Sequence, residues 1–188
     1  MNKSIKPFAD INFNQLEMDE LVDVFAEKNY PEISNMISSL AVHIDTAEKI
    51  DYKIHPEVKL MHVVFLDLKK LTEKHIAKEE RFLFPIVKKI GLAKKKRNFD
   101  SADDLLLIDG TLDELKSEHA KIKQQINQLV LLCMTNPLSV DSSPSLKSFY
   151  QEFKDLEYLM QKQFFIEDEV LIPKLVKFHN FLSEENIN

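Results

Sequence analysis

Apolar residues recur at helical spacing along four long segments of the chain. The segments run from about 18 to 50, from 55 to 90, from 111 to 134 and from 143 to 178. We expect each segment to form one long helix with an apolar face. The first segment contains Pro31, which is a candidate interruption because proline removes a backbone hydrogen bond from a helix interior.

Three of the segments begin with helix-start signals. Pro56 suits a first helical position, where no backbone donor is needed. Thr111 and Glu114 form a capping-box sequence. Ser143 precedes Pro144, a combination typical of a helix cap followed by the first helical residue. These signals support the division of the chain into four helices.

The longest connection is the polar stretch GLAKKKRNFDSADDLLLIDG between the second and third segments. We expect its basic cluster to be a solvated loop, followed by a short helix at Ser101–Ile108. One long and several shorter connections favour an antiparallel arrangement of the helices. The sequence therefore predicts an all-α fold, an up-down-up-down four-helix bundle. It predicts a single domain over residues 1–188, with the core at about 18–178.

Composition narrows the class of protein. Hydrophobic residues make up 44% of the 188 residues, whereas glycine occurs only twice and tryptophan not at all, which suits helices with a real core. No stretch approaches the ~20 apolar residues of a membrane span, and the N-terminus has no signal-peptide pattern. A single cysteine fits a reducing cytoplasm, and a net charge of −6 argues against a nucleic-acid partner. We expect a cytoplasmic protein with no membrane partner.

Two stretches of the chain repeat one motif. HIAKEERFLFP begins at His75, and QFFIEDEVLIP begins at Gln163. Glu79 in the first copy corresponds to Glu167 in the second, and both copies end in proline. The opening residue differs, since His75 is replaced by Gln163. In an up-down-up-down bundle the second and fourth helices run in the same direction, so the two copies predict a roughly two-fold central site.

The repeat predicts a group of metal-ligating side chains. His75 and Glu79 are four residues apart, so they share a helix face, and Gln163 and Glu167 have the same spacing. Distances from the predicted turns place further residues at this level, namely His119, with Tyr30 above. Two imidazoles and two carboxylates suit iron, manganese or zinc. The alternative is that the two glutamates face solvent on charged helices.

These motifs resemble the hemerythrin-like (HHE) family, above all its iron–sulfur cluster repair branch, also labelled regulator of cell morphogenesis and NO signalling. The resemblance covers residues from about 18 to 178. It rests on four motifs: HPEV at His55, H-x-x-x-E with LFP at His75, the EH pair at His119, and Gln163 to Glu167 with LIP. It implies a bundle around a non-haem di-iron centre, with bridging glutamates Glu79 and Glu167 and histidine terminal ligands.

Several ligand positions depart from the family pattern. The histidine of the first helix falls on Tyr30, and that of the fourth helix falls on Gln163. A further family histidine falls on Asp51, which we expect to lie too far along its helix to bind the same metal. An amide oxygen is a weaker ligand than imidazole, and a tyrosine must lose its proton to bind well. A mononuclear or reduced site is therefore favoured over a full di-iron centre, and an empty site stays open.

The sequence leaves two main functions open. The first is non-haem iron binding, with His75 and His119 as terminal ligands and O2 or NO as the small ligand, linked to an NO or oxidative stress response or to repair of an iron–sulfur protein partner. The second is a metal-free relative that acts as a regulatory or protein-interaction module. A carboxylate-rich ferritin-like oxidase is a third reading. Whether the chain is an enzyme, and whether it is a monomer or a homodimer, stays undecided.

Other residues are expected to be structural. The remaining histidines are interpreted as surface or turn residues, and five phenylalanines of the second and fourth helices as core. Cys133 is interpreted as a small buried apolar residue. The histidines are His43, His55, His62 and His179, and the phenylalanines are Phe65, Phe82, Phe84, Phe164 and Phe165.

Overall fold

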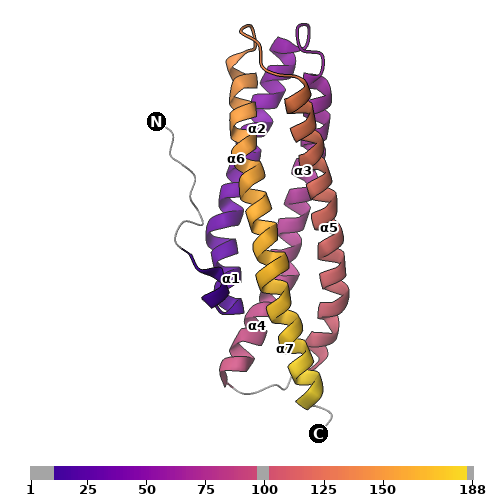
Figure 1. The fold of residues 1–188 in the computed structure, drawn as a ribbon. Coiled ribbons are helices and arrows are strands. Elements are labelled where there is room, and N and C mark those ends of the chain that lie inside the picture. Colours follow the sequence, from indigo (N-terminus) through magenta and orange to yellow (C-terminus); the bar gives the residue numbers. More distant parts are fainter. Residues whose placement is uncertain (1–10, 97–101, 186–188) are drawn as a thin grey trace. The chain divides into compact units, whose positions relative to one another are not determined.

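The fold of the described chain is entirely helical. A computed structural model describes residues 11–96 and 102–185, and within these ranges there is no strand. The helices form four long runs along the sequence, which Figure 1 shows in sequence colours. The predicted all-α class is confirmed at this level and is consistent with a helical bundle. No helix in the described ranges is long and apolar enough to cross a membrane.

Three of the four runs change their helical geometry part-way. A short 3-10 turn, η1 (Phe13–Gln15), precedes the first run. The first run consists of α1 (Met18–Val24), the π-helical turn η2 (Phe25–Asn29) and α2 (Tyr30–Asp51), and the second consists of α3 (Val58–Lys78), the π turn η3 (Glu79–Leu83) and α4 (Phe84–Lys96). The third run is the single helix α5 (Ala102–Thr135). The fourth run consists of α6 (Pro144–Ile166), the π turn η4 (Glu167–Leu171) and α7 (Ile172–Glu185).

The connection between the second and third runs was predicted incorrectly. Residues 88–96 of the basic cluster belong to α4 rather than to a loop, and 97–99 lie outside the described residues. The predicted short helix at Ser101–Ile108 is not separate, because α5 begins at Ala102 and continues without a break; Ser101 itself is outside the described residues. Alanine and leucine favour helix, and a single glycine, Gly110, costs only about 1 kcal/mol in a helix interior.

The described contacts divide the chain into two compact units. Unit 1 comprises residues 1–30, 75–117 and 162–188, and unit 2 comprises residues 31–74 and 118–161. Both units draw on helices from separate parts of the sequence.

In unit 1, α1 packs closely against α4, and Figure 1 shows the two helices beside each other. Gly91 makes this approach possible, because a Cβ at this position would lie only 3.0 Å from the Cβ of Asp19. An ion pair of 2.6 Å between Lys88 and Asp23 joins the same two helices. Glu17 and Glu20 form a capping box at the start of α1, which satisfies backbone donors that the helix leaves unpaired.

In unit 2, buried polar residues serve the helix ends. Asp51, at the end of α2, is 1% exposed and accepts hydrogen bonds from the backbone N–H and the hydroxyl of Ser143, at 2.9 and 2.5 Å. The Ser143 hydroxyl oxygen in turn accepts the N–H of Leu146 at 3.1 Å, so the predicted cap of α6 is confirmed. Phe65 and Phe149 pack edge to face in the core at 5.6 Å.

Two of the five phenylalanines predicted to be core are exposed. Phe82 is 61% exposed and Phe165 is 63% exposed, so the prediction was wrong for both. The reason is geometric, because neighbouring helical residues point about 100° apart, and Phe164 takes the inward direction next to Phe165. Cys133 is only partly buried, although burial raises the pKa of its thiol to about 11.

Candidate metal centre

Both glutamates of the repeated motif are buried. Glu79 and Glu167 are each 1% exposed, whereas their sequence neighbour Glu80 lies in solvent. The alternative that the two glutamates face water is therefore wrong. Burying a carboxylate is costly unless hydrogen bonds, a cation or a metal offset the loss of hydration. Their surroundings therefore decide what they do.

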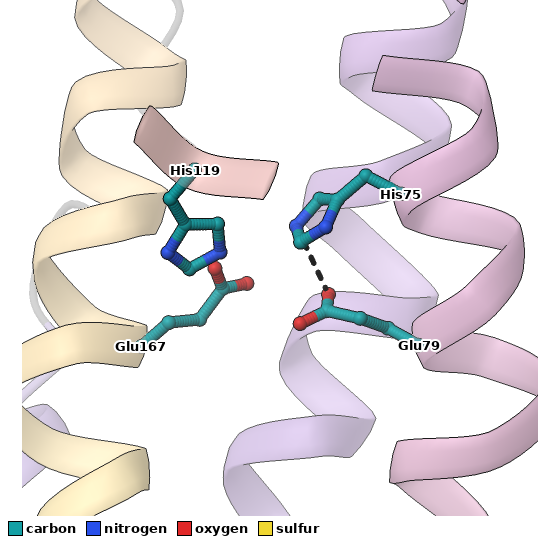
Figure 2. Close-up of side chains that lie close together, drawn as sticks. All are labelled: His75, Glu79, His119 and Glu167. Carbon is teal, nitrogen blue, oxygen red and sulfur yellow. Dashed lines mark ion pairs between the residues drawn. The ribbon is translucent and has the colours of Figure 1, made fainter. Parts of the chain in front are cut away.

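Four buried side chains form a group that could hold a metal ion. His75, Glu79, His119 and Glu167 each offer one ligand atom, and these four atoms all lie within 4.8 Å of one another. Figure 2 shows both imidazole rings and both carboxylates turned toward one another. The Nε2 atom of His75 lies 3.6 Å from Oε2 of Glu79. The structure thus brings together the four residues that the sequence predicted as ligands.

A π-helical turn begins at each of the two glutamates. Glu79 is the first residue of η3, and its carbonyl accepts the N–H of Phe84, five residues later. Glu167 is the first residue of η4, and its carbonyl accepts the N–H of Ile172. A π turn holds one more residue than an α turn, so it changes the direction in which the following and preceding side chains point. Such turns are frequent at functional sites.

A proline follows each π turn at the same distance. Pro85 comes two residues after η3, and Pro173 comes two residues after η4. Proline has no N–H and its ring clashes with the carbonyl four residues earlier, so a regular α turn is disfavoured there. The wider π turn relieves the clash. Both prolines are exposed, so their effect lies in the backbone rather than in core packing.

The first helical run contains a third copy of this arrangement, which sequence reasoning missed. The π turn η2 ends at Asn29, Tyr30 follows, and Pro31 comes next. The sequence FAEKNYP thus has the same layout as EERFLFP and EDEVLIP. The shared signal is a proline inside a long helical pattern; Pro31 was read as an interruption, but it follows a π turn in an otherwise continuous helix.

Tyr30 contacts both glutamates. It is 2% exposed, and its hydroxyl lies within hydrogen-bonding distance of Glu79 Oε2 and, at 3.1 Å, of Glu167 Oε1. Its ring stacks on that of Phe84, with the ring centroids 5.5 Å apart and an interplanar angle of 11°. The ring centroid of Phe25, in η2, lies 6.4 Å from that of Tyr30. All three rings are buried, so an apolar cluster surrounds the ring of Tyr30. Tyr30 therefore reaches both glutamates through its phenol hydroxyl.

Gln163 reaches Glu167 in the same way. Its amide nitrogen donates a hydrogen bond to Oε1 of Glu167, and its amide oxygen accepts one from Nδ2 of Asn29 at 2.5 Å. Asn29 is fully buried and was not predicted from the sequence. The two amides form a short relay from η2 to η4. Gln163 is therefore oriented by Asn29, with its nitrogen rather than its oxygen toward the carboxylate.

The other candidate residues lie elsewhere. Asp51 accepts two hydrogen bonds from Ser143, the cap of α6, in agreement with the expectation that it does not share the metal site. His62 is paired with Glu48, and His43 lies 3.7 Å from Glu152. Asp51, His62 and His43 therefore each have a partner other than Glu79 and Glu167.

His55 occupies the turn between α2 and α3, as predicted. Its Nδ1 lies 3.1 Å from Glu57, and its Nε2 lies 3.1 Å from the hydroxyls of both Ser139 and Ser142. Ser139 and Ser142 are also hydrogen-bonded to each other in the connection that precedes α6. His55 therefore links two turns of unit 2.

The donor set suits one divalent ion. Transition ions hold imidazole nitrogen and carboxylate oxygen at about 2.0–2.2 Å, so two donors on one ion are at most about 4.4 Å apart. Two ions separated by about 3.5–4 Å would spread their terminal donors over roughly 7 Å or more. The observed limit of 4.8 Å lies close to the first value. Two carboxylates also neutralise one divalent charge, given neutral imidazoles.

Comparison with known proteins adds no assignment. No protein-family model matches the chain, and no curated protein matches it at a significant level.

Proposed function

We propose that this protein binds a single non-haem iron ion through His75, Glu79, His119 and Glu167. The observation that carries the proposal is the buried convergence of these two imidazoles and two carboxylates within 4.8 Å. Nitrogen and oxygen donors in this mixture suit iron, and also manganese or zinc. Iron is preferred because of the resemblance to the hemerythrin-like family. In this proposal the four helical runs form an antiparallel up-down-up-down bundle of the hemerythrin-like kind.

The role of Tyr30 and Gln163 follows from their hydrogen bonds. Each donates to a carboxylate oxygen, Tyr30 to Glu79 and Gln163 to Glu167, and the Tyr30 hydroxyl also lies 3.1 Å from Glu167. A carboxylate held by such a donor keeps a fixed orientation, with one oxygen engaged and the other able to face the ion. Both residues thus orient the ligands. In the proposed centre they hold the glutamates where family relatives would place further histidines.

Such a centre would leave coordination positions open to a small molecule. Bound iron would supply an attachment point for O2 or NO, which fits a cytoplasmic protein of an NO or oxidative stress response or one that serves an iron–sulfur protein. The chain's own contribution is to orient the donors and to exclude water with Phe25, Tyr30 and Phe84. The ring of Phe164 lies 6.0 Å from that of His75 and extends this apolar wall.

One observation favours a second candidate, a metal-free regulatory or protein-interaction module. Tyr30 and Gln163 provide neutral donors to both glutamates, so the buried carboxylates are stabilised without a metal. In that case Tyr30→Phe should lower the free energy of unfolding by about 1.5–3 kcal/mol, the usual contribution of a hydrogen bond to a charged group. If the metal reading holds, added iron should reduce this loss, because the ion then stabilises the same carboxylates. Chemical denaturation with and without Fe(II) measures the difference.

The direct test is anaerobic titration of the purified chain with Fe(II), followed by metal analysis after gel filtration. We expect about one iron per chain. Glu79→Gln should abolish retention, whereas Glu80→Gln is the matched control and should not, since Glu80 is exposed on the same π turn. Parallel titrations with Mn(II) and Zn(II) establish the preferred ion. If wild-type protein retains no metal, the iron proposal is wrong and the metal-free module stands.

A further inference from the structure

A cavity in unit 1, separate from the metal group, combines apolar and basic side chains. It has a volume of about 940 Å³ and lies between the segment 14–18, Lys94 of α4 and one face of α7. Its volume is within the range of about 300–1,000 Å³ typical of small-molecule sites. The metal proposal does not use it.

The face of α7 that lines the cavity has a regular pattern. Lys174, Lys177, Phe178 and Phe181 all line the cavity, at spacings of three, four and seven residues that place them on one side of a helix. Phe178 and Phe181 lie 6.5 Å apart, so they form a continuous aromatic surface. The two lysines lie toward the N-terminal end of this face and the two phenylalanines toward its C-terminal end. The face is therefore basic at one end and apolar at the other.

Two lysines build the cavity wall. Lys174 donates hydrogen bonds to the backbone carbonyls of Asn14, at 3.1 Å, and Leu16, so it ties the segment 14–18 to α7. Lys94 forms an ion pair of 2.7 Å with Glu17, and this hydrogen bond holds the pKa of Glu17 below its usual value. The ammonium groups of these two lysines are thus already bound to partners within the protein. Met18, the last residue of this segment, is buried and contributes an apolar lining.

Lys177 is different from the other two lysines. It is exposed, and within residues 11–96 and 102–185 no acidic side chain forms an ion pair with it. The lining as a whole contains three lysines and one glutamate, a formal charge of +2 in a chain whose net charge is −6. A local positive charge in an acidic protein attracts anions to this place.

We propose that this cavity binds an anionic amphiphile, a fatty carboxylate, with its head group at Lys177 and its chain along Phe178, Phe181 and Met18. An ammonium group gives a charge-assisted hydrogen bond to a carboxylate. The aromatic and methionine side chains bury the hydrocarbon, which supplies affinity in proportion to the apolar area removed from water. The site is independent of the metal group and neither needs nor excludes bound iron.

The test is calorimetric titration of the full chain with dodecanoate below its micelle concentration. We expect saturable binding of about one dodecanoate per chain. Lys177→Gln should weaken binding about tenfold, the loss expected for one charge-assisted contact. Lys116→Gln, an exposed lysine of α5 in the same unit, is the matched control and should leave affinity unchanged. Dodecyltrimethylammonium, with the same chain and the opposite charge, should not bind.

A second variant examines the apolar end. Phe181→Ser should reduce the gain in affinity between decanoate and dodecanoate, because less hydrocarbon is buried, while leaving the dependence on the head-group charge. Equal losses in the two lysine variants, or no saturable binding by the wild-type chain, would overturn the proposal. Binding to vesicles of anionic phospholipid without binding to monomeric dodecanoate would also overturn it, since it would indicate surface attraction rather than a cavity.

Discussion

The two copies of the repeated motif share a backbone and differ in a side chain. In each copy a buried glutamate opens a π turn, and an exposed proline follows two residues after the turn ends. Four residues before the glutamate, however, one copy places the imidazole of His75 and the other the amide of Gln163. The difference shows that the π turn and proline, which orient the glutamate, are independent of the side chain four residues before it. The donor can change while the glutamate keeps its place.

The largest expected effect tests whether the two glutamates contribute equally to iron binding. Glu167→Gln should lower iron affinity as much as Glu79→Gln, by roughly a hundredfold or more, because each removes one charge from a buried ligand set. Equilibrium competition against a coloured iron chelator measures both. Retention of iron by Glu167→Gln alone would show that only the His75 copy binds metal. The exposed neighbour Glu169→Gln is the control for the second copy.

The next test removes the proline that follows the π turn in each copy of the motif. In Pro85→Ala or Pro173→Ala, the turn can return to α geometry and the glutamate should rotate away from its partners. We expect iron affinity to fall by about 10–100-fold, as for loss of an orienting partner. The free energy of unfolding should rise by up to about 3 kcal/mol, because proline is unfavourable in a helix interior.

These opposite signs separate positioning from general damage. A variant that merely disturbs the fold would lose affinity and stability together. Pro137→Ala, at an exposed proline in the connection between α5 and α6, is the control and should change neither quantity. Chelator competition and urea unfolding of the same samples give the two numbers. Unchanged iron affinity in both helix variants would contradict the role assigned to the prolines.

A smaller effect should come from restoring the missing imidazole. Gln163→His makes the second copy match the first at its opening residue, and imidazole is the stronger ligand. We expect iron affinity to increase about tenfold, with a further gain and a second iron when Tyr30→His is added. Metal analysis and the optical spectrum of the loaded protein check this. If neither variant gains iron, the geometry of the second copy has diverged as well as its side chain.

The smallest effect should come from the amide relay. Asn29→Ala leaves the oxygen of Gln163 without its 2.5 Å donor in a buried place, which typically costs about 1–3 kcal/mol of stability. Iron affinity should fall only several-fold, because Gln163 can still donate to Glu167. Urea unfolding and chelator competition measure the two effects. Asn29→Ala combined with Gln163→His should show less than the summed stability loss, since the relay is already absent.

The sequence predicted the helical class and the four clustered residues well, for a physical reason. Apolar periodicity fixes which face of a helix is buried, and His75 and Glu79, four residues apart, must share a face. Distance from the turns then placed His119 near Glu167. These inferences need only regular helix geometry, and that geometry holds over most of each run.

The features that the sequence did not predict depend on departures from regular geometry or on contacts distant in sequence. Asn29 contacts a residue 134 positions away, so no local pattern marks it. The π turns accompany prolines inside helices, yet from the sequence Pro31 was interpreted only as an interruption of its helix. The connection before α5 was misassigned because charged residues are common to loops and to exposed helix faces. Phe82 and Phe165 were misplaced because aromatic content alone does not choose a face.

The exposed prolines carry a consequence for mutational scans of this protein. If every position were varied and the library sorted by iron content, surface positions would ordinarily be neutral. Pro85 and Pro173 should stand out as surface positions with strong phenotypes, although their side chains are exposed and are not candidate ligands. A scan sorted by thermal stability should rank the same substitutions among the improvements. Surface prolines with this double signature in other helical proteins would be worth inspecting for a widened turn and an inward-facing carboxylate six residues before them.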